Sequence, residues 1–230
     1  MWDRTEIEVE LTLIRHGATA SNLEHRYLGR TDEPLCTEGV RMLERYQREG
    51  RYRKSGGYRA EDALFTGPML RCRQTAAILF PECEPVCIPE WTEMDFGRFE
   101  GKNYEELNGD PDYQAWIDSG GTIPFPGGES RTALQERTAR GFHRMMDHVA
   151  GQAVCRAAGQ VAYRTAGQRT QEREKRRIVA VVHGGTVMAL LSALFGEEYF
   201  AHQPKCGEGY LCRFLYSEQT IKLLELKKQC

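Results

Sequence analysis

The 230-residue chain carries 31 lysines and arginines against 33 acidic residues, which gives a formal charge of −2. This balance provides no basic field for nucleic acid. A hydrophobic share of 40% is enough for one sizeable core. Hydrophobic runs such as 178–182 are far shorter than the roughly 20 apolar residues that a membrane span takes. We therefore expect a single domain over residues 1–230, with no nucleic-acid or membrane partner.

Two further features bear on the compartment. The segment 1–6 holds charged residues and lacks the apolar stretch of a secretory signal, so we expect a cytoplasmic protein. Eight cysteines would suggest disulfides only in a small secreted chain. The pairs Cys83/Cys87 and Cys206/Cys212 lack the C-x2-C spacing of a structural zinc site. We predict buried or idle thiols and no bound metal or cofactor.

Strand and helix patterns alternate along most of the chain. The predicted elements are, in order, a strand at 9–14, a helix at 37–48, a strand at 63–65, a helix that Pro68 begins and that runs through Ile78, a strand at 86–88, a loop-rich stretch at 93–128, a helix at 129–149, a strand at 178–182, a helix at 186–195, and strands at 211–216 and 221–226. The unbroken β-branched run at 178–182 is typical of a strand buried on both faces. This order predicts an α/β layered fold with a mostly parallel central sheet. The polar stretch 151–177 has no steady period, and we expect a helical arm or a loop there.

Two histidines follow predicted strands directly: His16 after the first and His183 after the strongest. Ligands of open α/β sheets bind at the carboxyl ends of the strands. Each histidine precedes a glycine, which lets the backbone turn sharply and lets a ligand approach. Arg15 and Arg71, the latter in the first turns of a helix, add the guanidinium forks that match phosphate oxygens. We predict a pocket for a phosphate dianion with a basic imidazole inside it.

Five motifs in chain order carry a family resemblance. They are Leu13-Ile-Arg-His-Gly-Ala-Thr19 with Asn22, Tyr27-Leu-Gly-Arg-Thr-Asp32, Gly67-Pro-Met-Leu-Arg-Cys-Arg-Gln-Thr-Ala76, Glu93-Met-Asp-Phe-Gly-Arg-Phe-Glu-Gly101, and Pro126-Gly-Gly-Glu-Ser130 followed by Val182-His-Gly-Gly185. Together they resemble the histidine phosphatase superfamily, also called phosphoglycerate mutase-like. The resemblance covers most of residues 9–216 and implies a three-layer α/β/α fold.

The resemblance also implies the site and its chemistry. Its catalytic residues would be His16, Glu93, His183, Arg15 and Arg71, and its phosphate-binding residues Arg15, His16, Asn22, Gly29, Arg71, Glu93, His183 and Gly184. His16 would take the phosphate of a small-molecule phosphomonoester, Glu93 would protonate the leaving group, and water would release phosphate without a metal. Glu90, Asp95 and Glu100 compete locally for the acid's role, and only the match to the family selects Glu93.

Three departures from the family pattern remove no catalytic group. Thr66-Gly67 stands where many members have Ser-Ser or Thr-Ser, which could loosen the following helix start. Phe99 replaces a usual tryptophan, and the 151–177 stretch is longer than the usual connection.

The sequence is also compatible with other functions. A cofactor-dependent phosphoglycerate mutase would share His16, but mutases follow the acid with R-H-Y-G and carry a basic insertion, whereas this chain has Met-Asp-Phe-Gly. Among phosphatases the chain looks most like those acting on α-ribazole 5′-phosphate, with fructose-2,6-bisphosphatase and phosphoserine phosphatase types as relatives. A catalytically silent phosphate-binding module is the alternative of a different class. Both a monomer and a homodimer are compatible with the sequence.

Overall fold

The chain forms one six-stranded sheet in a computed structural model that describes residues 6–52, 63–160, 175–217 and 219–229. The strands are β1 (Ile7–Arg15), β2 (Ala63–Thr66), β3 (Val86–Cys87), β4 (Lys175–Val182), β5 (Gly209–Tyr216) and β6 (Ile221–Gln229). Their order across the sheet is β3-β2-β4-β1-β5-β6. Pairing is parallel from β3 to β1, and β5 is antiparallel to both of its neighbours. The sheet is therefore mostly parallel, as predicted.

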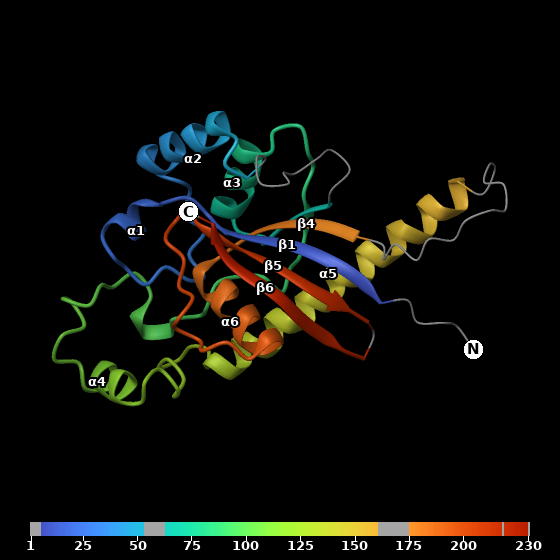
Figure 1. Cartoon of the computed structure of the whole chain (residues 1–230). Coiled ribbons are helices and arrows are strands. Elements are labelled where there is room, and N and C mark those ends of the chain that lie inside the picture. Colours follow the sequence, from blue (N-terminus) through green and yellow to red (C-terminus); the bar gives the residue numbers. More distant parts are fainter. Residues whose placement is uncertain (1–5, 53–62, 161–174, 218, 230) are drawn as a thin grey trace.

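Helices cover both faces of this sheet (Figure 1). The described helices are α1 (Ala20–Leu23), α2 (Thr37–Glu49), α3 (Leu70–Leu79), the 3-10 helix η1 (Gly97–Phe99), α4 (Pro111–Asp118), α5 (Arg131–Gln160) and α6 (Gly184–Phe195), and four of them cover the sheet. One face packs against α2 and α3, and the other against α5 and α6. This arrangement confirms the predicted three-layer α/β/α fold.

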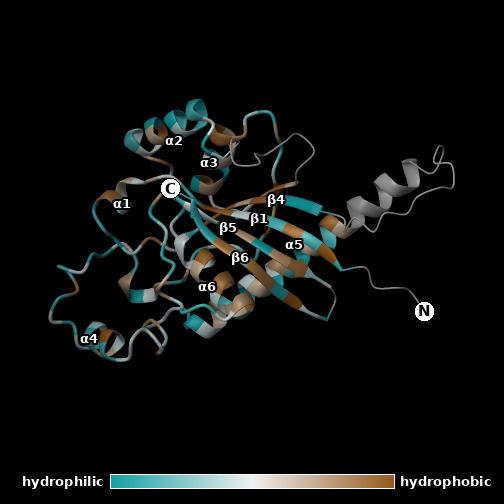
Figure 2. Cartoon of the chain, viewed as in Figure 1, coloured by the Kyte–Doolittle hydropathy of each residue, from teal (hydrophilic) through white to brown (hydrophobic). Residues whose placement is uncertain are grey.

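The central strand β4 shows why both faces need a cover. Ile178, Ala180 and Val182 pack with α5 and α6, whereas Val179 and Val181 pack with α2 and α3. All five side chains are buried. Because side chains alternate along a strand, an unbroken apolar run places hydrophobic groups on both sides. Figure 2 shows the matching difference between α6, which is largely hydrophobic, and α2, which mixes both kinds of residue.

The start of α3 differs from the sequence-based prediction. Pro68 was expected at the first helical position, but the helix begins at Leu70 and Met69 is its extended N-cap. The Leu70 N–H donates to Asp32 Oδ1 at 2.6 Å, so a carboxylate from a distant segment fixes the first turn. A start that is held by tertiary contact is not visible in the local sequence. The Asp32 carboxylate thereby stabilises the start of α3, which Thr66-Gly67 was expected to loosen.

The elements on either side of 151–177 end at other residues than predicted, although a helix over 151–160 is one of the two forms expected there. The helix expected to end at Val149 continues as α5 to Gln160, and β4 begins at Lys175. A single helical glycine costs only about 1 kcal/mol relative to alanine, so Gly151 does not end the helix. Residues 161–174 lie outside the described part of the chain. The short helix α1 was not predicted, and its Thr19/Asn22 capping box explains how four residues form a turn.

The described cysteines form no disulfide, and the expectation that their thiols have no role stays a prediction. Cys36, Cys72, Cys83, Cys87, Cys206 and Cys212 are all free. Within the described ranges, no helix is long and apolar enough to cross a membrane.

Candidate functional site

The carboxyl ends of β1, β2 and β4 meet at one edge of the sheet. The register pairs Arg15 with Val182 and Thr66 with Val181. The His16 N–H donates to the Val182 carbonyl at 2.9 Å, which continues the ladder one residue beyond β1. His16 and His183, one residue past each strand, therefore come together with ring centroids 5.2 Å apart. The two histidines singled out in the sequence lie side by side.

His16 is held in one tautomer. Its Nδ1 lies 2.6 Å from the Gly17 carbonyl, which can only accept, so Nδ1 carries the proton. The lone pair is then on Nε2. Burial and the neighbouring guanidinium groups of Arg15 and Arg71 hold the His16 pKa well below its usual range, against the opposing effect of the Gly17 carbonyl. The ring is 2% exposed and neutral at physiological pH.

Arg71 is fully buried at the start of α3. Its Nη1 donates to the Thr31 carbonyl at 2.8 Å, and its Nη2 donates to the Gly29 carbonyl at 2.9 Å. Its Nε is buried and has no partner among the described residues. Buried polar groups are nearly always hydrogen-bonded. The unpaired Nε–H of Arg71 is therefore a donor that could bind an oxygen of an anion near His16.

Arg15 shows the same pattern from the end of β1. Its Nη1 donates to the Pro204 carbonyl at 2.9 Å, and its Nε is another buried donor without a partner in the described part of the chain. The guanidinium lies against Gly184, because a Cβ built there would be 3.4 Å from Arg15 Cζ. Gly184 is the first residue of α6, whose N-terminal N–H groups favour negative charge.

Glu93 is a carboxyl group in a dry environment. It is 7% exposed, and its Oε1 and Oε2 accept from the Met94 N–H (2.8 Å) and the Gly185 N–H (3.2 Å). Burial raises the pKa of Glu93 above its ordinary value, although both hydrogen bonds and the nearby Arg71 and Arg15 lower it. A carboxyl whose pKa is raised suits proton donation near neutral pH. Among its local competitors, Glu90 is paired with Arg144 and Glu100 accepts from main-chain N–H groups.

His183 is the N-cap of α6 and is completely buried. Burial first, and then Arg71 and His16, hold its pKa well below the usual range. Cys72 Sγ lies 3.4 Å from its Nε2 and 3.8 Å from its Nδ1. Burial raises the pKa of the Cys72 thiol far above its ordinary value, so the sulfur stays protonated. Cys72 therefore packs on the ring as a thiol and is no rival nucleophile to His16.

Two other predicted phosphate contacts occupy different environments. Asn22 lines the cavity described below, and its Oδ1 accepts from the Thr19 N–H at 3.2 Å, which leaves the amide nitrogen as the end able to donate to an oxyanion. The Gly29 N–H donates to both oxygens of Glu100 at 3.0 Å, and its carbonyl accepts from Arg71. The phosphate contact expected of Gly29 stays a prediction, while its hydrogen bonds place Arg71.

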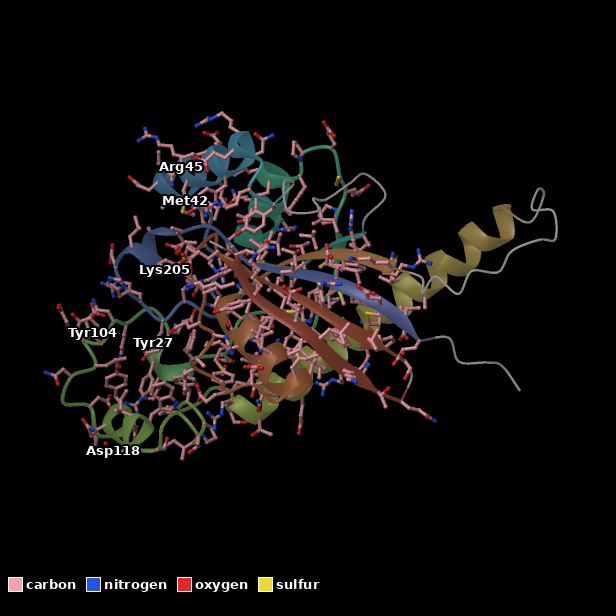
Figure 3. All side chains as sticks on the ribbon, in the orientation of Figure 1. Tyr27, Met42, Arg45, Tyr104, Asp118 and Lys205 are labelled. Carbon is pink, nitrogen blue, oxygen red and sulfur yellow. The ribbon has the colours of Figure 1, made fainter. Side chains whose placement is uncertain are left out.

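A cavity of about 650 Å³ opens next to these groups. Its lining includes Arg15, Asn22, Glu93, Gly184 and Gly185, whereas His16, Arg71 and His183 are buried and are not among the lining residues. Aromatic side chains make up much of the remaining wall. They are Tyr27, Phe96, Tyr104, Trp116, Phe125, Tyr199 and Phe200. Figure 3 labels Tyr27 and Tyr104, which come from different segments on the side of the molecule where α4 lies.

The cavity lining also carries positive charge. Arg131 and Lys205, the latter labelled in Figure 3, line the cavity without an ion-pair partner among the described residues. The Arg131 guanidinium lies 5.3 Å from the centre of the Tyr199 ring. By contrast, Arg26 is already paired with Glu24 and Glu106. Within the described residues, no group of three or more His, Cys, Asp or Glu side chains is placed to hold a metal ion.

Sequence reasoning missed several residues of the site. Gln203 and Cys206 line the cavity from the loop before β5, and the Pro204 carbonyl holds Arg15. That loop contains none of the five motifs, so nothing in the sequence indicated it. Trp116 and Phe125 lie in the stretch 93–128 that was predicted to be rich in loops, and their aromatic character was the available signal.

The match to a family model decides the classification. The model of the histidine phosphatase superfamily (branch 1) matches residues 11–229. The chain belongs to this superfamily. Members of the histidine phosphatase superfamily are enzymes that act on small-molecule phosphates as phosphatases or mutases, and the matched range contains every predicted site residue.

Individual relatives divide between these two activities. A 2,3-bisphosphoglycerate-dependent phosphoglycerate mutase of Methylobacterium radiotolerans is 29% identical over 194 residues, covering 81% of this chain and 79% of that protein. The uncharacterized phosphatase PhoE of Bacillus subtilis is 26% identical over 213 residues, covering 92% and 90%. The structure of the α-ribazole phosphatase from Shigella flexneri superposes with a TM-score of 0.69 at 20% identity, covering 96% of this chain and 97% of that one. That last likeness bears on the fold alone.

Proposed function

We propose that this histidine phosphatase superfamily member is a metal-independent phosphomonoester hydrolase that forms a phosphohistidine on His16. The observation that carries the proposal is the hydrogen bond from His16 Nδ1 to the Gly17 carbonyl. It leaves the Nε2 lone pair available inside a pocket whose guanidinium groups would attract a phosphate dianion. A lowered pKa keeps that imidazole neutral, as a nucleophile must be.

The first step transfers the phosphoryl group to the enzyme. His16 Nε2 attacks phosphorus, the P–N bond forms, and the P–O bond to the leaving group breaks. Glu93 gives its proton to the leaving oxygen, so that the alcohol departs neutral. Arg15 and Arg71 offset the charge on the phosphoryl oxygens through their free Nε–H groups. Asn22, His183 and the N–H of Gly184 complete the proposed set of phosphate contacts.

The second step returns the enzyme to its starting state. Water enters the position that the alcohol has left, and the Glu93 carboxylate takes one of its protons. The oxygen attacks phosphorus, the P–N bond breaks, and inorganic phosphate leaves with neutral His16 restored. The same carboxyl serves as acid and then as base, which its environment permits because burial raises its pKa.

The cavity wall supports a leaving group larger than a glycerate. Trp116 and Phe125 stack with ring centroids 4.7 Å apart, and Tyr199 and Phe200 line the wall with them. Aromatic surfaces of this kind favour a flat ring. α-Ribazole 5′-phosphate, with its aromatic base, is therefore our first candidate substrate, in line with the activity named for the Shigella flexneri protein.

A phosphoglycerate mutase is the second candidate function, because relatives of comparable similarity carry that name. Arg131 and Lys205 favour it in one respect, since they would hold the carboxylate of a glycerate. A mutase must keep its intermediate away from water until phosphate is returned to a second hydroxyl. We favour hydrolysis because the basic insertion that mutases carry has no counterpart in this sequence.

The test is phosphate release in excess chelator from α-ribazole 5′-phosphate, phosphoserine, 3-phosphoglycerate, fructose 2,6-bisphosphate and p-nitrophenyl phosphate. We expect turnover without added metal, fastest with an aromatic leaving group, and none in His16→Ala. Interconversion of 2- and 3-phosphoglycerate that outruns phosphate release would establish the mutase instead. A protein that binds phosphate but turns over no substrate would be the silent binding module. A cytoplasmic location and the choice between monomer and homodimer stay predictions.

A further inference from the structure

The segment 126–130, which the proposed reaction does not use, holds an arginine next to the proposed proton donor. Glu129 belongs to this segment, and its Oε1 and Oε2 accept from Arg137 Nε (3.0 Å) and Nη2 (2.8 Å). The pair is bidentate, and its side chains are only 12% and 14% exposed. Such a geometry fixes a guanidinium in orientation as well as in position.

The Nη1 and Nη2 groups of Arg137 also donate hydrogen bonds to the main chain around Glu93. Nη1 donates to the Glu90 carbonyl at 2.5 Å, the Thr92 carbonyl at 3.0 Å and the Thr92 Oγ1 at 2.8 Å. Nη2 lies 3.4 Å from the carbonyl of Glu93 itself. One side chain from α5 thus bonds three carbonyl groups in the four residues that end at Glu93.

Glu129 secures the chain on the other side of the donor. Its N–H donates to the Asp95 carbonyl at 2.9 Å, and its Oε2 accepts from the Asp95 N–H at 3.4 Å. Glu93 itself lies in neither helix nor strand. Its placement therefore depends on contacts from outside its own segment. The Gly185 N–H bonds the carboxylate, while Arg137 and Glu129 bond the main chain on either side of it.

We infer that Arg137 and Glu129 are positioning residues for the reaction: together they fix the main chain on both sides of Glu93, so that its carboxyl group faces the leaving oxygen. This inference rests on the proposed role of Glu93 as proton donor. General acid catalysis requires a placement within hydrogen-bond reach, and small displacements reduce the rate steeply. The Pro-Gly-Gly-Glu-Ser motif thereby gains a function in catalysis without touching substrate.

The consequence is a change in leaving-group dependence. An alkyl phosphate needs the proton from Glu93 because its alkoxide leaves poorly, whereas p-nitrophenolate leaves without one. The ratio kcat/KM reports the first phosphoryl transfer, before water is involved. We expect Arg137→Met to lower kcat/KM about 100-fold for an alkyl phosphate but only about threefold for p-nitrophenyl phosphate.

The matched control is Arg144→Met. Arg144 lies on the same helix and donates to the Glu90 carboxylate at 2.6 Å in the same segment, but it bonds no main-chain group there in the described structure. We expect this variant to keep the wild-type kcat/KM for both substrates. Glu129→Gln keeps the side-chain shape but weakens the ion pair with Arg137. We expect it to show the same selective loss of kcat/KM for the alkyl phosphate, but a smaller one. It replaces Arg137→Met in the experiment if that variant does not fold.

The results distinguish the positioning role of Arg137 and Glu129 from the proposed role of Glu93 as proton donor. Equal losses for both substrates in Arg137→Met or Glu129→Gln would show a general structural role and would overturn the inference. Glu93→Gln should show the selective loss most strongly. If Glu93→Gln does not, the proposed proton donor is wrong; if only Glu93→Gln shows it, the proposed donor stands and the positioning role fails.

Discussion

At the scale of single residues, the site depends on which atoms are already occupied. His16 keeps Nε2 available because Nδ1 is bonded to Gly17, and Arg71 keeps Nε available because its other nitrogens are bonded to Thr31 and Gly29. The sequence identified these side chains through motifs and residue types. It could not identify the three main-chain partners, because a carbonyl group is present at every position and only the folded backbone determines which of them is used.

The close contact between Gly185 and Glu93 gives a residue-scale prediction. A Cβ at position 185 would lie 2.2 Å from Glu93 Oε1, so Gly185→Ala must displace the carboxyl group. We expect kcat/KM for an alkyl phosphate to fall by about 100-fold, the size of a lost general acid. Ser192→Ala, two turns further along α6, is the control and should keep the wild-type rate. A Gly185→Ala enzyme with wild-type kinetics would mean that the carboxyl group is not needed where it lies.

At the scale of elements, strands and long helices were predictable and their ends were not. The 178–182 run predicted β4 because a continuous β-branched segment has few alternatives. The start of α3 and the length of α5 escaped prediction for different reasons. The start of α3 is fixed by a hydrogen bond to Asp32 from a distant segment. The helix α5 continues beyond Gly151 because good helix formers follow that glycine. Local sequence patterns show neither a distant capping contact nor the residue at which a long helix ends.

The order of elements was more informative than their boundaries. Parallel strands joined by helices bring their carboxyl ends to one edge, so two histidines at strand ends were expected at the same edge of the sheet. The observed register of β1 and β4 makes them neighbours. The aromatic wall of the cavity was not predictable in this way, because its residues come from loops whose paths no periodicity records.

At the scale of the whole molecule, the two buried histidines link stability to pH. Both pKa values are held below the ordinary 6.5 in the folded state, chiefly by burial. Below pH 6.5 the unfolded chain binds protons that the folded chain does not. The stability from each neutral ring is therefore complete above pH 6.5 and is lost as pH falls toward the folded pKa, at up to about 1.4 kcal/mol per pH unit.

Urea unfolding at two pH values, one on each side of this window, would measure the effect. We expect the wild-type free energy of unfolding to drop from about pH 7.5 to about pH 5.5 by roughly 1–3 kcal/mol more than that of a His16→Gln/His183→Gln variant. Glu93 acts in the opposite sense, since a raised pKa favours the folded state below its ordinary value, and it is common to both proteins. An identical drop in both would contradict the assignment of neutral buried rings.

The central claim is that phosphate passes through His16, and trapping the intermediate tests it most directly. The enzyme would be mixed with p-nitrophenyl phosphate, whose good leaving group speeds formation of the phosphoenzyme, in chelator and quenched within milliseconds in alkali, which preserves phosphohistidine. Peptide mass spectrometry and phosphorus NMR would then locate the phosphate. We expect phosphate on Nε2 of His16, because Nδ1 is hydrogen-bonded to the Gly17 carbonyl. Phosphate on another residue or on Nδ1 of His16, or steady turnover with no phosphoenzyme, would contradict it.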